Sequence, residues 1–145
     1  VETNWHAIKR AEQKSPATSI LDGVPKGLPA LTHAQLLQER AARTGFDWED
    51  IQGVLRKVGE ELEELNLAEG DSAREAELGD ILFSIVNLAR WLRLSAEDAL
   101  RKADTRFRKR FTLMERLSRD RGLSFESLAL EEKESLWQEA KELTT

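Results

Sequence analysis

The segment LGDILFSIVNLARWL, from Leu78 to Leu92, constrains the fold of this chain more than any other stretch. Its side chains are apolar almost all the way round a helix, a pattern typical of a helix buried on most sides. A chain of 145 residues has room for one domain with a sizeable core. Because so small a domain offers limited cover for such a helix, we expect burial by a partner subunit of a homodimer as well as by the chain itself.

The remaining composition favours helices over strands. Leu, Ala, Glu and Arg dominate, and the three prolines all precede residue 30. Prolines and glycines forbid a helix over residues 15–31, whose apolar side chains indicate a segment packed on the domain. We predict an all-α helical bundle in a single domain over residues 1–145, with an N-terminal helix and this packed segment in 1–31 and a helical core over 33–143. Helices are expected at about residues 4–14, 33–43, 48–67, 73–92, 96–119 and 131–143.

Capping residues mark several of these helix ends. Asp47 is expected to cap the helix that runs to Leu67, and Asp71 with Ser72 the helix after it. Gly45 and Gly122 are expected to close the helices that precede them, as glycine often does at a helix C-terminus.

Several classes of function are excluded or disfavoured. The chain has no cysteine, which excludes disulfides, thiolate zinc sites and cysteine nucleophiles. No apolar run is long enough to cross a membrane, and the N-terminus does not resemble a signal peptide, so we expect a cytoplasmic protein without a membrane partner. The net charge of −5 argues against general binding of nucleic acid.

Carboxylates are concentrated between Glu60 and Asp80. On a helix with about 100° per residue, four apolar positions fall within roughly 80° of one another and mark the core side: Leu55, Val58, Leu62 and Leu65. Glu61 and Glu64 border this apolar stripe, whereas Glu60 and Glu63 point to the open side. A Glu-rich helix is most often a solvated surface, and that interpretation stays open on spacing alone.

The next helix favours a metal site. Glu77, Asp80, Ser84 and Asn87 fall on one narrow strip of the apolar segment. Buried carboxylates are costly unless they are paired or bind a cation, and they would repel those of the preceding antiparallel helix. A divalent cation resolves this conflict. Ligation by oxygen alone favours Mg²⁺ or Mn²⁺, and Mg²⁺ held in this way usually also takes phosphate oxygens.

Cations suited to phosphate lie further along the chain. Arg106 and Arg110 are one turn apart on one helix face, with Lys102 one turn before them. A solvated basic stripe is the alternative interpretation. Trp137 and Lys141 are also spaced by one turn, although a tryptophan there is more often a core anchor.

The residues at this point carry a resemblance to a known family. The pattern Glu60-Glu61-x-x-Glu64, followed by Glu77-x-x-Asp80, resembles the EExxE…ExxD signature of the all-α NTP pyrophosphohydrolase superfamily. Six further segments resemble, in order, the MazG family of nucleoside triphosphate pyrophosphohydrolases: NWHAIKRAE, SILDGVPKGLPAL, RAARTGFDW, ELGDILFSIVNLAR, RFRKRF and LWQEAK. The resemblance is to the catalytic second half of two-domain members and covers essentially the whole chain.

The resemblance implies a Mg²⁺-dependent homodimer, with Mn²⁺ as a substitute, that converts NTPs and dNTPs to the monophosphate and pyrophosphate as nucleotide-pool house-cleaning. It implies four metal ligands: Glu61, Glu64, Glu77 and Asp80. It places Lys57 and Glu60 beside the nucleotide, Arg106 and Arg110 on phosphates, and Trp137 and Lys141 near the nucleotide, where they close the site. Glu60, Glu61 and Lys141 are the expected catalytic residues.

Two positions depart from the family pattern. Asp104 stands where Asn is expected, and Arg106 where Lys is usual, which keeps the charge but alters the reach to phosphate. Two other functions stay open: a hydrolase narrowly specific for dUTP or modified nucleotides, and a non-catalytic dimeric helical scaffold.

Overall fold

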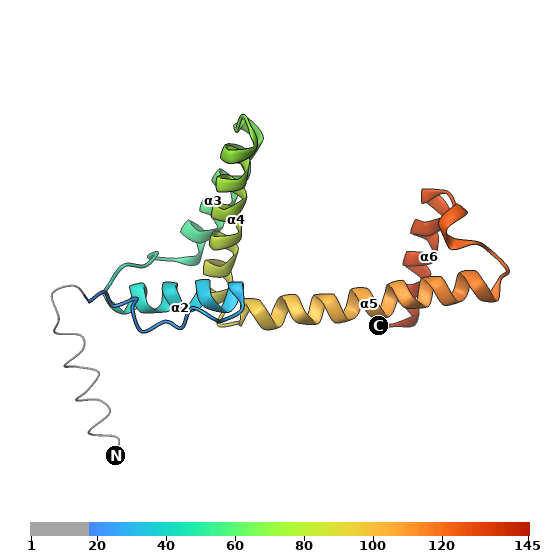
Figure 1. Cartoon of the computed structure of the whole chain (residues 1–145), viewed down its shortest axis with the longest axis horizontal. Coiled ribbons are helices and arrows are strands. Elements are labelled where there is room, and N and C mark those ends of the chain that lie inside the picture. The colour runs from blue at the N-terminus through green and yellow to red at the C-terminus, as the bar shows by residue number, and fades with distance from the viewer. Residues whose placement is uncertain (1–17) are drawn as a thin grey trace, which may run out of the picture. The chain divides into compact units, whose positions relative to one another are not determined.

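The structure, a computed structural model, describes residues 18–145 (Figure 1). Within these residues it consists of helices and the turns between them, with no strand, which confirms the all-α prediction. The expected helix at residues 4–14 lies outside the described part. The α-helices are α2 (Ala30–Arg43), α3 (Ile51–Leu67), α4 (Asp71–Trp91), α5 (Ala96–Asp120) and α6 (Leu130–Leu143), with a short 3-10 helix, η1 (Phe125–Ser127), between the last two.

The helix ends follow the predicted positions closely, but two predicted caps are wrong. Asp50, not Asp47, caps α3, because its Oδ1 accepts a hydrogen bond of 2.8 Å from the Gly53 amide. Asp71 is already the first helical residue of α4, which begins without a side-chain cap after Gly70. Gly70 has a φ of 86°, in the left-handed region that favours glycine.

Two predicted glycine stops are confirmed. Gly45 (φ 91°) follows α2, and the Phe46 amide donates back to the Ala41 carbonyl at 3.3 Å. Gly122 (φ 70°) follows α5, and the Leu123 amide donates back to the Ser118 carbonyl at 2.9 Å. Both are Schellman closures, in which a left-handed residue lets the chain return to satisfy the last helical carbonyls.

Residues 18–97 belong to one compact unit of the chain. In it α3 and α4 lie side by side as an antiparallel hairpin, and α2 packs on α4 (Figure 1). Val54, Ile81 and Val86 are buried at this packing. The Gln38 side chain ties α2 to α4, because its Nε2 donates to the Phe83 carbonyl at 2.9 Å.

The Pro/Gly-rich segment lies against α2. Val24 is buried, and the Arg40 guanidinium donates to the Ile20 carbonyl at 3.1 Å. A Cβ on Gly23 would meet the same guanidinium at 2.7 Å, so glycine permits this close approach.

The core side expected for α3 is rotated in the structure. Val54 and Glu61 are buried against α4, whereas Leu55 and Leu62 are 44% and 51% exposed. The expectation failed because it assigned four apolar positions of the helix to one core, although the main packing partner of α3 among the described residues of this unit is α4. In the same way α4 leaves Leu82 and Ile85 about half exposed, so the single chain does not bury this helix on most sides. The homodimer that would cover these side chains stays a prediction.

Residues Asp98–Thr145 form the second compact unit. Its core contains Met114 of α5 with Leu136 and Ala140 of α6. Phe111 and Phe125 pack against this core, and their two rings meet edge to face. The chain turns back after α5, and α6 crosses α5 at a steep angle (Figure 1). Near the end of α6, Arg110 Nε donates to Thr144 Oγ1 at 3.2 Å. The single domain over residues 1–145 stays a prediction.

Truncating the core of the second unit should destabilise it strongly. Leu136→Ala removes a buried side chain between α5 and α6, so we expect the free energy of unfolding to fall by about 2–5 kcal/mol. Leu130→Ala, on the same helix but 70% exposed, should change it by less than about 0.5 kcal/mol. Urea denaturation followed by circular dichroism measures both, and equal losses would contradict this packing.

Candidate metal centre and adjoining pocket

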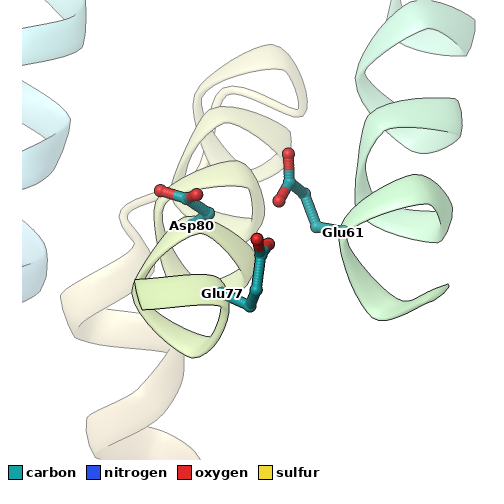
Figure 2. A group of neighbouring side chains, drawn as sticks. All are labelled: Glu61, Glu77 and Asp80. Atoms are coloured by element: carbon teal, nitrogen blue, oxygen red, sulfur yellow. The ribbon is translucent and has the colours of Figure 1, made fainter. Parts of the chain in front are cut away.

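Three carboxylates meet between α3 and α4. Figure 2 shows Glu61 of α3 facing Glu77 and Asp80 of α4. One oxygen from each lies within 4.8 Å of the other two. Glu61 is buried, Glu77 half-buried and Asp80 exposed, so the group is open to solvent on one side. The apolar pattern of α4 predicted that Asp80 is buried, and this prediction is wrong because Asp80 is exposed.

Lys57 neutralises the most buried member of this trio. Its Nζ lies 2.7 Å from Glu61 Oε1, one turn along α3. The hydrogen bond from Lys57 holds the pKa of Glu61 below its usual range, although burial opposes it. The same contact raises the pKa of Lys57. Both groups are therefore charged at neutral pH.

Glu77 has the opposite environment. Burial, with the nearby carboxylates of Glu61 and Glu64, raises the pKa of Glu77 to about 6. Its Oε2 and the Oε2 of Glu61 are buried and have no hydrogen-bond partner among the described residues. Buried oxygens without donors are costly, and a divalent cation would satisfy both.

The donor set fits a hard divalent cation. All ligands offered by the trio are carboxylate oxygens, which suit Mg²⁺ or Mn²⁺. Glu64, the fourth expected ligand, is exposed and is not among the three carboxylates that meet within 4.8 Å. It is nevertheless close enough to Glu77 to act on its pKa. Glu60 is exposed, with an oxygen 4.0 Å from Lys57 Nζ.

A cavity of about 690 Å³ opens beside the trio, within the first unit. Lys57, Glu61 and Asp80 form its charged end. Its other walls are largely apolar or aromatic and include Leu37, Phe46, Trp48 and Phe83. This volume is typical of small-molecule sites.

An ion pair that the sequence analysis missed holds one wall of this pocket. Arg90 Nη1 and Nη2 donate to the two carboxylate oxygens of Asp47 at 3.0 and 2.6 Å. Nη2 also donates to Asn87 Oδ1 at 2.9 Å. The hydrogen bonds from Arg90 lower the pKa of Asp47. Asp47 thus connects the loop before α3 to α4, and no spacing signal predicts this because 43 residues separate the partners.

Breaking this pair should cost more than breaking a solvated one. The Arg90 and Asp47 side chains are 14% and 27% exposed, so we expect Arg90→Met to lower the free energy of unfolding by about 2 kcal/mol. Arg121→Met removes a bidentate pair with Glu139 whose side chains are 47% and 37% exposed. That control should lower the free energy of unfolding by clearly less than Arg90→Met does.

The effect of Arg90→Met should also depend on pH. Asp47 has a lowered pKa in the folded chain, so its contribution is present above its ordinary pKa and is lost as the pH falls through the lowered value. Denaturant titrations at pH 7 and in acid measure the difference. Two results would contradict this account of the pair. One is a loss of unfolding free energy in Arg90→Met that stays the same in acid, and the other is an equal loss in Arg90→Met and Arg121→Met.

Arg106, Arg110 and Lys141, unlike Lys57, belong to the second unit. Arg110 of α5 lies over the Trp137 ring of α6, with its guanidinium carbon 5.9 Å from the ring centroid. Phe107 packs against the same ring at 5.7 Å. Arg106 is exposed and Lys141 half-buried. Arg110 and Trp137 are thus brought together, while an approach of these cations to the carboxylate trio stays a prediction.

Asp104 forms no ion pair with a described residue, Arg108 included. None of the helices in the described part is long and apolar enough to cross a membrane.

Comparison with curated proteins gives close relatives. The chain is 43% identical over 137 residues to a Thermotoga maritima protein named nucleoside triphosphate pyrophosphohydrolase/pyrophosphatase MazG, covering 94% of this chain and 54% of the relative. It is 44% identical over 147 residues to the nucleoside triphosphate pyrophosphohydrolase of Escherichia coli K12, covering 97% and 56%.

A third relative is an uncharacterized Bacillus subtilis protein, YabN, 42% identical over 146 residues, which cover 98% of this chain and 30% of the relative. A scan against protein-family models finds no match. The chain spans about half the length of the two nucleoside triphosphate pyrophosphohydrolases that it matches. With this identity over nearly all of its residues, and with three carboxylates of its signature gathered between two helices, the chain belongs to the MazG family.

Proposed function

We propose that this chain hydrolyses nucleoside triphosphates, NTPs and dNTPs, to the nucleoside monophosphate and pyrophosphate with the help of Mg²⁺. The observation that carries the proposal is the trio of Glu61, Glu77 and Asp80, whose carboxylate oxygens lie close enough together to bind one cation. Two of these oxygens, one on Glu61 and one on Glu77, are buried and have no hydrogen-bond donor among the described residues. Relatives at 43% and 44% identity are named for this activity. A role in nucleotide-pool house-cleaning, in the cytoplasm, follows as part of the proposal.

The trio and Glu64 would hold the metal. A divalent cation in such a site would neutralise triphosphate oxygens and lower the pKa of a bound water. Mn²⁺ would replace Mg²⁺, because both prefer carboxylate oxygens. Lys57, whose Nζ lies 2.7 Å from Glu61 Oε1, would bind a phosphate oxygen if that carboxylate held the metal.

Glu60 is the proposed general base. It lies one position before Glu61 and is exposed, so it can accept a proton from the water that attacks the α-phosphorus. Pyrophosphate leaves with the electrons of the broken P–O bond. Arg106, Arg110 and Lys141 would stabilise the charge on this leaving group, and Trp137 would close the site near the nucleotide.

A homodimer belongs to the proposal. Leu55 and Leu62 of α3, with Leu82 and Ile85 of α4, are each exposed by more than two fifths. Apolar side chains gathered on one helical hairpin usually mark an interface. Mass measurement during size-exclusion chromatography distinguishes a dimer from a monomer.

Two alternatives make different predictions. A scaffold without activity would melt at the same temperature whether or not Mg²⁺ and a non-hydrolysable nucleotide are added. The proposed hydrolase should melt higher with both ligands than with neither, because ligands that bind only the folded state stabilise it. A panel of NTPs and dNTPs with pyrophosphate detection then separates a broad enzyme from one specific for dUTP or modified nucleotides.

A further inference from the structure

We propose that Lys57 is an internal counter-ion of the carboxylate trio and makes the binding of a divalent cation and of phosphate depend on each other. In the metal-free chain the Lys57 ammonium group is paired with Glu61, and it leaves this carboxylate when a divalent cation binds there. The released lysine then binds the phosphates of the substrate. The inference rests on the proposed function, because it takes Mg²⁺ to bind the trio and a triphosphate to bind beside it.

Lys57 pairs with the least exposed carboxylate of the trio. Its Nζ lies 2.7 Å from Glu61 Oε1, whereas the nearest oxygen of Glu60 is 4.0 Å away. The Glu61 side chain is 5% exposed, so water screens its charge poorly. Among the described residues, Lys57 is the cation that forms an ion pair with Glu61. The lysine therefore supplies positive charge at the place where a metal would supply it.

This contact withholds negative charge from a metal. The trio brings three carboxylates within 4.8 Å of one another, and Lys57 balances the charge of one of them. The affinity of an oxygen site for a divalent cation depends on how many of its ligands are charged. A lysine and a divalent cation on the same buried carboxylate also repel each other strongly. The pair of Lys57 and Glu61 should thus weaken the binding of Mg²⁺ to the free chain.

Lys57 is able to leave Glu61 without a change in the helix. Its side chain is 36% exposed and lines the charged end of the cavity beside the trio. A lysine ammonium group is strongly hydrated and sits on a flexible stem of four carbons. Phosphate oxygens bound near the trio would give this group new acceptors for charge-assisted hydrogen bonds.

The two binding events should therefore favour each other. A divalent cation on Glu61 frees Lys57 for phosphate, and a phosphate that draws Lys57 away restores the third negative charge of the trio. Thermodynamic linkage requires each ligand to raise the affinity for the other by the same factor. The site should consequently favour a triphosphate that arrives with its metal over either ligand alone.

Isothermal titration with Mg²⁺ alone tests the metal side of this coupling. We expect Lys57→Met to bind Mg²⁺ about 10-fold more tightly than the wild-type chain, because no hydrogen-bonded ion pair has to be broken. In EDTA the same variant should melt at a lower temperature than the wild-type chain, because Glu61 is then buried without a counter-ion.

Arg56→Met is the matched control. Arg56 is the preceding residue on α3, is exposed and forms no ion pair with a described residue. Its replacement removes the same charge from the same helix, so it should change the affinity for Mg²⁺ less than about 2-fold. An unchanged or weaker affinity in Lys57→Met, or an equal gain in Arg56→Met, would overturn the role of Lys57 as the counter-ion.

Isothermal titration with tripolyphosphate in EDTA tests the phosphate side. Glu61→Gln removes a metal ligand but frees Lys57, so it should bind tripolyphosphate about 10-fold more tightly than the wild-type chain. Asp80→Asn removes the same charge from the trio and leaves Lys57 paired with Glu61, so its gain should be less than about 3-fold. Adding Lys57→Met to Glu61→Gln should abolish the gain.

Two results of the phosphate titrations would overturn the coupling. One is the absence of a gain in Glu61→Gln, and the other is an equal gain in Asp80→Asn or in the double variant. A failure of the proposed function is separately visible, because the wild-type chain in Mg²⁺ would then release no pyrophosphate from any nucleotide, whatever the affinities of these variants.

Discussion

Replacing Glu61 with Gln should lower the turnover of nucleoside triphosphates more than about 100-fold, since changes even to residues behind metal ligands cost 10- to 100-fold. Glu61 is 4% exposed, and it faces both Glu77 and Asp80 across the α3–α4 hairpin. The amide retains the shape of the side chain but loses the negative charge that Lys57 now pairs with and that a metal would need. Steady-state rates of pyrophosphate release measure the effect.

Controls must separate this effect from loss of folding. Glu63→Gln lies on the exposed side of the same helix and should change turnover less than about 2-fold. Asp80→Asn alters an exposed member of the trio, so it should preserve folding and still abolish turnover. An Asp80→Asn variant that is folded and substantially active in Mg²⁺ would contradict the proposed metal centre.

Glu77→Gln should stabilise the metal-free chain while removing its response to Mg²⁺. At pH 7.5 the wild-type Glu77 is ionised beside two other carboxylates, because its pKa, although raised, is about 6. The neutral amide removes this repulsion, so the metal-free variant should melt at a higher temperature than the wild-type chain. Adding Mg²⁺ should raise the melting temperature of the wild-type chain and leave that of the variant nearly unchanged.

The pH dependence has a definite sign. The pKa of Glu77 is raised in the folded chain, from an ordinary value of 4.5 to about 6. Folding therefore favours its protonated form, and the group makes the metal-free chain less stable as the pH rises from 4.5 to 6. The difference in the free energy of unfolding between Glu77→Gln and the wild-type chain should thus be largest above pH 6 and should disappear near pH 4.5.

The affinity for Mg²⁺ should rise with pH over the range in which the metal-free chain becomes less stable. A proton on Glu77 competes with the metal, so affinity should fall as the pH drops through about 6. Differential scanning fluorimetry over this pH range, with EDTA or Mg²⁺, measures both effects. Destabilisation by Glu77→Gln in EDTA, or a full response of that variant to Mg²⁺, would show that the trio does not hold the metal.

Local chemistry allowed most helices to be predicted from the sequence. Prolines confined to the N-terminal segment, an acidic cap before α3 and left-handed glycines after α2 and α5 are signals that act within a few residues. The choice of Asp47 as the cap failed for a non-local reason. Its carboxylate is engaged by Arg90 on another helix, and the nearer Asp50 is free to cap α3.

The carboxylate trio was predictable in part because two of its members obey helical spacing. Glu77 and Asp80 lie one turn apart, and a short turn at Gly70 brings α3 back against α4. The degree of burial was not predictable. Amphipathic analysis assigned Leu62 to the core and Glu61 to its border, but the contact with α4 buries Glu61 and leaves Leu62 half exposed. Apolar residues on a helix can therefore lie on a side that its own chain does not cover.

The pocket was beyond prediction from spacing. Gln38, Trp48 and Asn87 lie on three different segments and carry no motif of their own. Gln38 is held in the pocket by the bond from its Nε2 to the Phe83 carbonyl. Only the packing of α2 on α4 decides this.

Phosphorus NMR of the products formed from ATP tests the proposed activity itself. The chain with Mg²⁺ should yield AMP and pyrophosphate in equal amounts, without ADP, and the yield should vanish with EDTA and with Glu61→Gln. Formation of ADP and phosphate, or the same AMP and pyrophosphate from Glu61→Gln, would contradict the proposal that the trio between α3 and α4 carries a pyrophosphohydrolase reaction.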